Sequence, residues 1–416
     1  MRVLLLILQF PPDVNATGLL MGQVGEDLVS RGHSVSVLTT FPHYEKFRVW
    51  DEYRGKFAQR ERYRGMDVLR LYVHATGTKR RLTNRLLSYL SFNALATAAG
   101  VASRDSYDVI LCPNGSFFSG LSAAAIGSAK NVPFIYNVQD LYPETPVRTG
   151  HLRNGLAIRG LERLERFMYS RAAHVSVITP SFRDHVLKKA TDLTPDRVSV
   201  IPNFVDTEFV RPLPKRNPFS EAQALTDRFV ITHAGNLGYA YDLETLLDVA
   251  ALLKSEPDML FLLVGDGVVK PRLERKAQAL GLDNVRFLPL QPHASLPWLR
   301  AASDVQVALY RRGSASHSMP SKVYEIMASG RPVLAAADAH SDLSNLVENT
   351  GCGVCVEPQD PVALADALRE LRRDAAEREN MGQRGRAVAE RQYARPVVVD
   401  RYADLLQRVA RERRAA

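Results

Sequence analysis

The sequence has few of the features that mark secreted or membrane-spanning proteins. Only three of its 416 residues are cysteine, which excludes a disulfide-stapled scaffold and is typical of a reducing cytosol. The opening apolar run, Val3–Leu8, is far shorter than the roughly 20 residues that span a bilayer. It also lacks the length and cleavage site of a signal peptide. We therefore expect a cytoplasmic protein in which this run is a buried strand.

Metal-ligating residues are also too sparse to predict a metal centre. Cys352 and Cys355 form a C-x-x-C pair, but no second ligand pair lies nearby in the sequence. Residues 353–357 read as a strand, in which positions three apart face opposite sides. His174 and His293 have no partners at ligand spacing. We expect these four residues to be structural and the protein to need no metal or other cofactor.

What the sequence does contain is the composition of a large globular protein. Hydrophobic residues make up 46% and charged residues 24% of the chain, which excludes disorder as the dominant state. The length suggests two or three domains. The net charge of +9 lies mostly in residues 1–210 and favours anionic partners such as phosphates or acidic membranes. Nucleic acid is not expected, because no recognisable binding module accompanies the charge.

Short apolar runs alternate with helical stretches along the whole chain, and this predicts an α/β fold of repeated βαβ units. The strands predicted before residue 202 are 3–8, 34–39, 67–74, 109–112, 133–138, 175–179 and 198–201. The strands predicted after residue 218 are 229–234, 259–264, 285–288, 305–309, 332–335 and 353–356. Four prolines in 202–218 read as a linker. We therefore predict two doubly wound Rossmann-like domains, whose ligands bind beyond the carboxyl ends of the strands.

The most informative stretch is 313–335, GSASHSMPSKVYEIMASGRPVLA. Pro320 suits the first turn of a helix, and Ser318 and Ser321 are candidate caps for its free amides. Lys322 and Glu325 are three apart, so they share one helix face. A lysine beside a helix start can bind phosphate, and a carboxylate one turn further can accept hydrogen bonds from two ribose hydroxyls. The alternative is a surface Lys–Glu ion pair, which would stabilise the protein by only tenths of a kcal/mol. The serine-rich segment that precedes Pro320 favours the interpretation as a binding site.

This arrangement, P-S-K-x-x-E-x-M-A-x-G-x-P-V, resembles the donor-binding signature of retaining glycosyltransferases of the family-4 type, which have the GT-B fold. Four further segments resemble motifs of that family in the expected order: 32–37 (GHSVSV), 201–206 (IPNFVD), 233–238 (HAGNLG) and 264–267 (VGDG). The resemblance covers essentially the whole chain. Each motif alone is weak, but five in the right order form a specific signal.

The resemblance implies a GT-B architecture in which two Rossmann-like domains face a cleft. Residues 1–205 are then the acceptor domain, residues 206–395 bind the nucleotide-sugar donor, and a C-terminal helix over 396–416 packs back on the first domain. The expected catalytic residues are Asp140, His317, Lys322 and Glu325. The expected nucleotide-binding residues are Gly18, Gly235, Asn236, Gly238, Gly265, Leu288, Pro320, Ser321, Lys322 and Glu325.

The sequence departs from the family pattern at several positions. The family has two glutamates eight positions apart; Glu325 matches the second, but His317 replaces the first. An arginine and a lysine that grip the diphosphate in many members are here Asn236 and Tyr241, and Phe204 replaces a turn glycine. Such departures resemble the branch that acts on bacterial O-antigen and capsule sugars, including amino-deoxysugar (L-fucosamine-type) transferases.

Two segments of the first half keep alternative interpretations. Residues 9–18 lie where the family places a Gly-rich loop that faces the diphosphate, but with one glycine the segment also reads as an ordinary strand-to-helix connection. Residues 137–144 match the family's H-D-x-x-P in Asp140 and Pro143 only. Asp140 or Glu144 can orient or deprotonate the acceptor hydroxyl, or one of them can cap the next helix.

A basic run precedes an apolar one in the first half. Lys79, Arg80, Arg81 and Arg85 precede a run that contains Leu86, Leu87, Tyr89, Leu90 and Phe92. This pattern predicts an amphipathic helix that lies on an anionic membrane surface. A solvated helix face is the alternative. Membrane contact is favoured because a lipid-linked acceptor would explain why a basic run lies beside an apolar one.

The resemblance therefore implies transfer of a sugar, with retention, from a nucleotide-diphosphate sugar to a carbohydrate acceptor. We expect UDP rather than GDP in the donor, a lipid-linked acceptor, and a role in bacterial surface polysaccharide or glycoconjugate synthesis. Two alternatives remain: a non-catalytic nucleotide-sugar-binding partner, and a nucleotide-sugar epimerase on the same fold.

Overall fold

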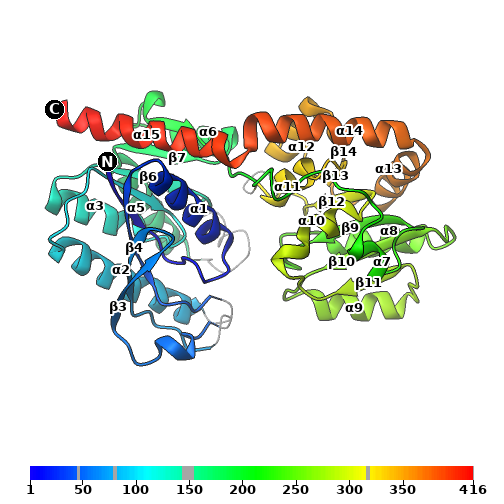
Figure 1. Cartoon of the computed structure of the whole chain (residues 1–416), viewed down its shortest axis with the longest axis horizontal. Helices are drawn as coiled ribbons and strands as arrows, with labels where there is room; N and C mark the ends of the chain where they lie inside the picture. The colour runs from blue at the N-terminus through cyan, green and yellow to red at the C-terminus, as the bar shows by residue number, and fades with distance from the viewer. Residues whose placement is uncertain (45–46, 78–81, 143–153, 315–318, 416) are drawn as a thin grey trace. The chain divides into compact units, whose positions relative to one another are not determined.

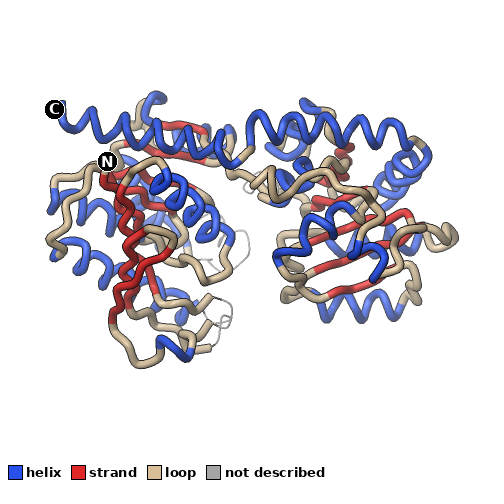
Figure 2. The backbone as a smooth tube through the Cα atoms, in the orientation of Figure 1, coloured by secondary structure: helices blue, strands red, loops and turns tan. Residues whose placement is uncertain are grey.

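The computed structural model consists of two compact units, Met1–Pro202 together with Val398–Ala416, and Asn203–Val397. Each unit is built around one sheet of mainly parallel strands, drawn in red in Figure 2. The predicted α/β architecture of two doubly wound units is confirmed. The residues that the structure describes are 1–44, 47–77, 82–142, 154–314 and 319–415.

The first unit contains an eight-stranded sheet in the order β3-β4-β2-β1-β5-β6-β7-β8. Its strands are β1 Arg2–Leu6, β2 Ser34–Thr40, β3 Ala58–Tyr63, β4 Met66–Leu71, β5 Val109–Pro113, β6 Phe134–Val138, β7 His174–Val177 and β8 Val198–Val200. The central strands are apolar and fully buried, as β5 and β6 show. Such strands lie in parallel sheets that are covered on both faces.

Strand β3 is the element that sequence patterning missed. It pairs antiparallel with β4 and forms the edge of the sheet. Its sequence AQRERY is polar and alternates between exposed and half-buried positions. Charged residues on an edge strand discourage pairing with another chain. The sequence pattern therefore did not indicate this strand, because β3 is a polar segment with no continuous apolar run.

Helices cover both faces of this sheet (Figure 1). They are α1 Ala16–Ser30, α2 Leu82–Ala102, α3 Ser119–Lys130, α5 Gly155–Arg171, α6 Pro180–Lys189 and α15 Arg395–Ala415. Strands β2 and β5 flank β1 on opposite sides, so right-handed crossovers place α1 and α2 on opposite faces. Helix α15 is the last helix of the chain, and from Val398 onward it belongs to the first unit. There Asp400 pairs with Arg31 at 2.6 Å, and the Asn137 side-chain amide donates to the Tyr402 hydroxyl at 3.1 Å.

The second unit contains a six-stranded sheet in the order β11-β10-β9-β12-β13-β14. Its strands are β9 Phe229–Ala234, β10 Met259–Val264, β11 Val285–Leu288, β12 Val305–Leu309, β13 Val333–Ala336 and β14 Gly353–Val356. Its helices are α7 Pro218–Ala222, α8 Leu243–Leu252, α9 Lys270–Ala279, α10 Leu296–Ala301, α11 Lys322–Ala328, α12 Asp342–Thr350, α13 Pro361–Arg373 and α14 Ala375–Val388, followed by a π-helical segment Ala389–Tyr393.

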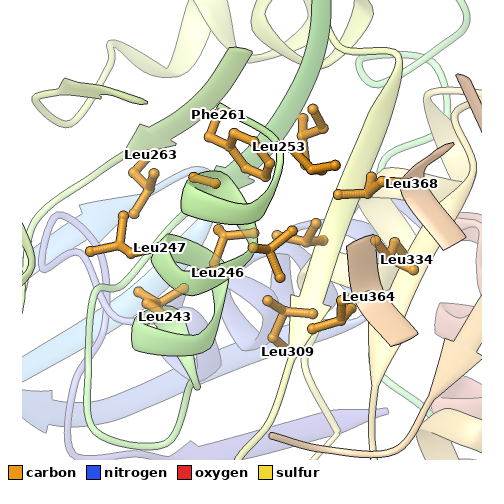
Figure 3. Close-up of a cluster of buried hydrophobic side chains, with 14 of the residues drawn as sticks. Leu243, Leu246, Leu247, Leu253, Phe261, Leu263, Leu309, Leu334, Leu364 and Leu368 are labelled. Carbon is orange, nitrogen blue, oxygen red and sulfur yellow. The ribbon is translucent and has the colours of Figure 1, made fainter. Parts of the chain in front are cut away.

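Alternate residues of these strands feed two apolar layers. Phe229 and Ile231 join one cluster and Val230 and Ala234 the other, because successive strand residues point to opposite faces. Figure 3 shows the larger cluster, in which leucines of α8 and α13 pack against β10, β12 and β13. Packing in these two layers holds β9, β10 and β12 in place, and the candidate site lies at the carboxyl ends of these strands.

The proline-rich segment predicted as a linker is packed into the second unit. Phe204, Val205 and Val210 are buried. Val205 donates its amide to Tyr393 at 2.9 Å and accepts from the amide of Arg395 at 2.9 Å. The segment includes a turn in which the Val210 amide donates to the Asp206 carbonyl at 2.8 Å, and its buried apolar residues form part of the second unit.

The cysteines and histidines without ligand spacing have structural surroundings. Burial raises the pKa of the Cys352 thiol and raises that of Cys355 to about 11. His174 is buried, bonds the Ser199 hydroxyl at 2.8 Å, and has a pKa lowered to about 4, mainly by burial. His293 stacks on Phe209 with ring centroids 4.4 Å apart. Among the described residues, no three His, Cys, Asp or Glu side chains are grouped to hold a metal ion.

Candidate functional site

The second sheet reverses its strand order at β9. Strand β9 pairs with β10 on one side and with β12 on the other, because the chain runs from β9 outward to β10 and β11 and then crosses to the other side of β9 as β12. Ligands of doubly wound sheets bind at the carboxyl ends of strands at such a switch point. The residues at these ends are His233 near the end of β9, Gly235 after β9, Gly265 after β10, and Tyr310 after β12.

Glycines allow two backbone turns to approach each other closely at this edge. Gly265 has a φ of +140°, and a Cβ there would lie 2.0 Å from the carbonyl oxygen of Gly235. The Gly235 amide donates to Val264 at 2.9 Å, and the Gly265 amide donates to Leu288 at 3.1 Å. Gly235, Gly265 and Leu288, which are predicted to bind the nucleotide, thus hold the backbone of the turns together. Contact between these residues and a nucleotide remains a prediction.

Two amides of the same turn have no acceptor among the described residues. Leu237 donates its amide to Asp266 at 2.8 Å. No acceptor for the amides of Asn236 and Gly238 occurs in the described part of the chain. Lys270 brings a cation to the turn, where its amine donates to the Gly265 carbonyl at 3.2 Å. The turn therefore offers unpaired N–H groups beside a positive charge, which suits an anionic ligand.

Helix α11 begins differently from the expectation. Ser321 makes no side-chain capping bond, because its φ of −56° and ψ of −27° are already helical. A capping residue needs an extended backbone for its hydroxyl to reach the next amides, so the prediction of Ser321 as a cap is wrong. Ser318 and His317 lie outside the described residues. Val323, Ile326 and Met327 are buried as predicted.

The Lys322 side chain is buried in the second unit. Its amine lies 3.2 Å from Nδ1 of His233 and 3.9 Å from the centroid of the Tyr241 ring. Burial lowers the pKa of Lys322 well below its usual value, and nearby Arg300 lowers it further while Glu325 opposes the shift. Tyr241 stacks on Tyr310 with centroids 5.4 Å apart. The amine thus sits at the switch point, against a histidine and an aromatic face.

Glu325 is half-buried and forms an ion pair with the buried guanidinium of Arg300 through its Oε2. Arg300 is held in turn by the side-chain carbonyl of Gln306 at 2.6 Å. Oε1 of Glu325 has no partner in the part of the chain that the structure describes. The alternative of a surface Lys322–Glu325 pair is therefore wrong, because the lysine is buried and the glutamate pairs with an arginine.

Sequence patterning did not reveal the two residues that contact Lys322 and Glu325, namely His233 and Arg300. His233 was recognised only as the first residue of a motif, and its contact with Lys322 joins positions 89 apart. Arg300 lies in α10, LPWLRA, a short and mostly apolar helix. The arginine within this apolar helix could have indicated a buried polar contact, because a buried arginine needs a hydrogen-bond acceptor.

In the first unit, Asp140 follows β6 at the carboxyl edge of the sheet and is exposed. The buried side chain of Asn114 fixes its backbone: Nδ2 donates to the Asp140 carbonyl at 2.6 Å, and Oδ1 accepts from the amide of Gln139 at 2.8 Å. Asp140 is therefore presented on a rigid turn. Glu144 and Pro143 lie outside the described residues.

Gly18 lies in the first turn of α1. Its amide donates to the Asn15 side chain at 3.1 Å, and a Cβ on Gly18 would lie 2.6 Å from the Gln9 carbonyl oxygen. Asn15 is thus the helix cap, and the glycine lets the helix pack on the preceding loop. These contacts give Gly18 a role in the strand-to-helix connection; a contact with diphosphate remains a prediction.

Helix α2 has three leucines facing outward near its start. Leu86, Leu87 and Leu90 are 44%, 47% and 46% exposed, whereas Phe92 is fully buried. Phe92 therefore belongs to the core, and the predicted contact of this helix with a membrane remains a prediction. Arg85 is exposed and donates to the Tyr89 hydroxyl at 3.3 Å. Lys79, Arg80 and Arg81 lie outside the described residues.

No helix within the described ranges has both the length and the apolar character needed to cross a bilayer. Helix α2 packs on the first sheet through buried residues that include Phe92 and Ala96.

Comparison with known proteins matches both units. Residues 19–203 match the model of the glycosyl transferase 4-like domain, and residues 215–388 match that of glycosyl transferases group 1. The chain is similar to WcaI of Escherichia coli, named as a colanic acid biosynthesis glycosyl transferase, with 26% identity over 89% of this chain and 92% of WcaI. It is also similar to WbjE of Pseudomonas aeruginosa, named as a glycosyltransferase, with 27% identity over 78% of this chain and 80% of WbjE.

Among solved structures, HepE of Anabaena in complex with UDP has the same fold, with a TM-score of 0.73 at 18% identity over 98% of this chain and 100% of HepE. Both halves of the chain, the order of their motifs and the two-sheet architecture thus agree with one family. The chain belongs to the GT-B glycosyltransferases, with a glycosyl transferase 4-like domain followed by a group 1 glycosyl transferase domain, and it is a glycosyltransferase.

Proposed function

We propose that this enzyme transfers a sugar, with retention, from a UDP-sugar to a lipid-linked carbohydrate acceptor in the synthesis of a bacterial surface polysaccharide. The observation that carries the proposal is the group at the switch point of the second sheet. There Lys322, Glu325 and the amides of Asn236 and Gly238 lie on elements that meet at the ends of β9 and β12. The name of WcaI, which refers to colanic acid biosynthesis, supports a carbohydrate acceptor. The UDP bound in HepE supports uracil as the base of the donor nucleotide.

In this proposal each polar group at the switch point has one task. Oε1 of Glu325 accepts from the ribose hydroxyls, while Arg300 holds Oε2 and so fixes the carboxylate plane. Lys322 and the amides of Asn236 and Gly238 face the diphosphate and stabilise the negative charge that grows as it leaves. No metal is needed for that step, because fixed N–H groups and a cation supply the positive potential. The leaving phosphate accepts the proton of the incoming hydroxyl.

Asp140 is the proposed acceptor-orienting residue of the first unit. It is exposed at the carboxyl edge of the sheet, and Asn114 holds its backbone. A carboxylate there can accept a hydrogen bond from the acceptor hydroxyl and direct its lone pair toward the anomeric carbon.

Product formation from a panel of UDP- and GDP-sugars with a bacterial membrane extract tests the activity. We expect turnover of a UDP-sugar, and a loss of about 100-fold or more in turnover for Asp140→Asn, with unchanged UDP affinity by calorimetry. Asp192→Asn, at another exposed position of the same unit, is the matched control and should transfer normally. Binding of UDP without turnover of any donor would favour a non-catalytic nucleotide-sugar-binding partner.

We extend the proposal to an anionic membrane surface that contacts the start of α2. Exposed Leu86, Leu87 and Leu90 would enter the headgroup region, and Lys79, Arg80, Arg81 and Arg85 would neutralise acidic lipids. Each cation near such a surface contributes about 1 kcal/mol. A lipid-linked acceptor would then be presented at the surface where the enzyme is bound.

Vesicle flotation separates the two contributions. Replacing the four cations with Gln should weaken binding to vesicles with acidic lipid by at least about tenfold. Replacing the three leucines with Ser should weaken binding to acidic and zwitterionic vesicles alike. A triple Ser variant at Leu156, Leu252 and Leu280, which are also exposed, is the matched control. Equal flotation of all variants and the parent protein would refute the membrane proposal.

A further inference from the structure

The amine of Lys322 is buried among partners that carry no negative charge. The residue is only 9% exposed, and its amine contacts Nδ1 of His233 and the face of the Tyr241 ring. Within the described ranges, no carboxylate lies within 4.0 Å of this amine. The acid on the same helix, Glu325, is paired with Arg300 instead. Among the described residues, Lys322 is therefore a buried lysine without an ion-pair partner.

The surroundings of His233 determine which nitrogen carries its proton. Nε2 lies 3.4 Å from the carbonyl oxygen of Asn236, and a carbonyl only accepts, so this nitrogen carries the hydrogen. Nδ1 is then the free acceptor for the Lys322 amine. Burial, and next the charge of Lys322, lower the pKa of His233 well below its usual value. His233 is therefore a neutral ring that holds the lysine amine in place.

In the part of the chain that the structure describes, the titratable and charged groups around this amine come from five elements. They are Glu325 on α11, Arg300 on α10, His233 on β9, Tyr241 in the following turn, and Tyr310 after β12, stacked on Tyr241. The charges of Arg300 and Glu325 compensate each other. Protonation of Lys322 would thus add one uncompensated positive charge to a buried site, and burial disfavours that form. An anionic ligand would reverse this balance.

We propose that Lys322 takes up a proton from solvent when a nucleoside diphosphate binds, with His233 as the residue that positions its amine. This inference rests on the proposed donor site. One proton is added to Nζ, and no covalent bond changes. The site then presents its full positive charge only when a diphosphate is present, which would reduce the cost of keeping a buried ammonium in the empty protein. It also gives the enzyme a substitute for the two basic residues replaced by Asn236 and Tyr241.

Calorimetric titration of the full chain with UDP tests the proposal. The titration is repeated at pH 8.5 in buffers of different ionisation enthalpy, well above the phosphate's own pKa of about 6. The slope of the observed enthalpy against buffer enthalpy gives the protons taken up. We expect an uptake approaching one proton per UDP, which decreases as the pH falls through the pKa of Lys322 in the empty site. UDP affinity should fall by up to about tenfold per pH unit above that pKa.

Two variants distinguish the groups. Lys322→Arg stays charged at every pH used, so it should bind UDP without proton uptake. His233→Gln keeps a neutral acceptor for the lysine, so proton uptake should persist. UDP binding with no uptake by the parent protein between pH 7 and 9 would overturn this inference and leave the donor site intact. Loss of uptake in His233→Gln, with binding retained, would move the proton to the histidine and overturn it as well. Failure to bind UDP or GDP would overturn both this inference and the proposed function.

Discussion

Replacing Glu325 with alanine is expected to abolish UDP binding and sugar transfer together. In the proposed site, the carboxylate accepts hydrogen bonds from ribose hydroxyls. Each hydrogen bond to a charged group contributes about 1.5–3 kcal/mol. Loss of two such bonds should lower UDP affinity by about two orders of magnitude or more, since 1.4 kcal/mol corresponds to a factor of ten. Calorimetry with UDP and product formation with the preferred donor would measure the two effects.

The Arg300 contact requires a control for folding. Alanine at position 325 also removes an ion-pair partner from the buried Arg300 guanidinium, and a buried charge that loses its partner destabilises a protein. Glu325→Gln retains an oxygen that can accept from Arg300, so its unfolding temperature should stay nearer to that of the parent, while UDP affinity still falls by about tenfold or more. Glu377→Ala, which breaks the Glu377–Arg384 pair in the same unit, is the matched control and should bind UDP normally. Unchanged UDP affinity in Glu325→Ala would refute the ribose assignment.

The strands of both sheets were predictable because parallel strands buried on both faces are continuous apolar runs. Predicted strand 229–234 coincides with β9, and 259–264 with β10. Strand β3 was not predictable by the same rule, because an edge strand with charges at alternate positions has no such run. The helix near Lys322 was expected, but its start was not, since capping depends on the backbone angles of Ser321.

The candidate site was predictable only in those parts that lie close together in the sequence. Lys322 and Glu325 share one helix turn, and spacing alone pairs them. Their actual partners, His233 and Arg300, come from other elements and are set by the order of the strands. That order brings the end of β9 beside β12, and a single sequence does not reveal which histidine or arginine will lie there. The polar contacts of the buried lysine therefore required the structure.

The other large effect is expected for Gly265→Ala. Gly265 has a φ of +140°, a backbone conformation that residues with a Cβ rarely adopt, and the new Cβ would lie 2.0 Å from the carbonyl oxygen of Gly235. The obstructing atom belongs to the backbone, and the Gly235 amide is tied to Val264, so the two turns must separate. Backbone strain costs about 1–3 kcal/mol and overpacking about 1–3 kcal/mol more. We expect the second unit to lose about 4 kcal/mol of its free energy of unfolding.

Tryptophan fluorescence can report on the second unit alone. The sequence has two tryptophans, of which Trp50 lies in the first unit and Trp298 in the second. In a Trp50→Phe background, urea unfolding followed through Trp298 should show a lower midpoint for Gly265→Ala. Gly238→Ala is the matched control: its Cβ would lie 2.9 Å from the side-chain nitrogen of Asn236, an atom that can rotate away, so the free energy of unfolding should change by less than about 1 kcal/mol. Equal midpoints for the two variants would mean that the turns can separate without cost and that close backbone approach is not what Gly265 provides.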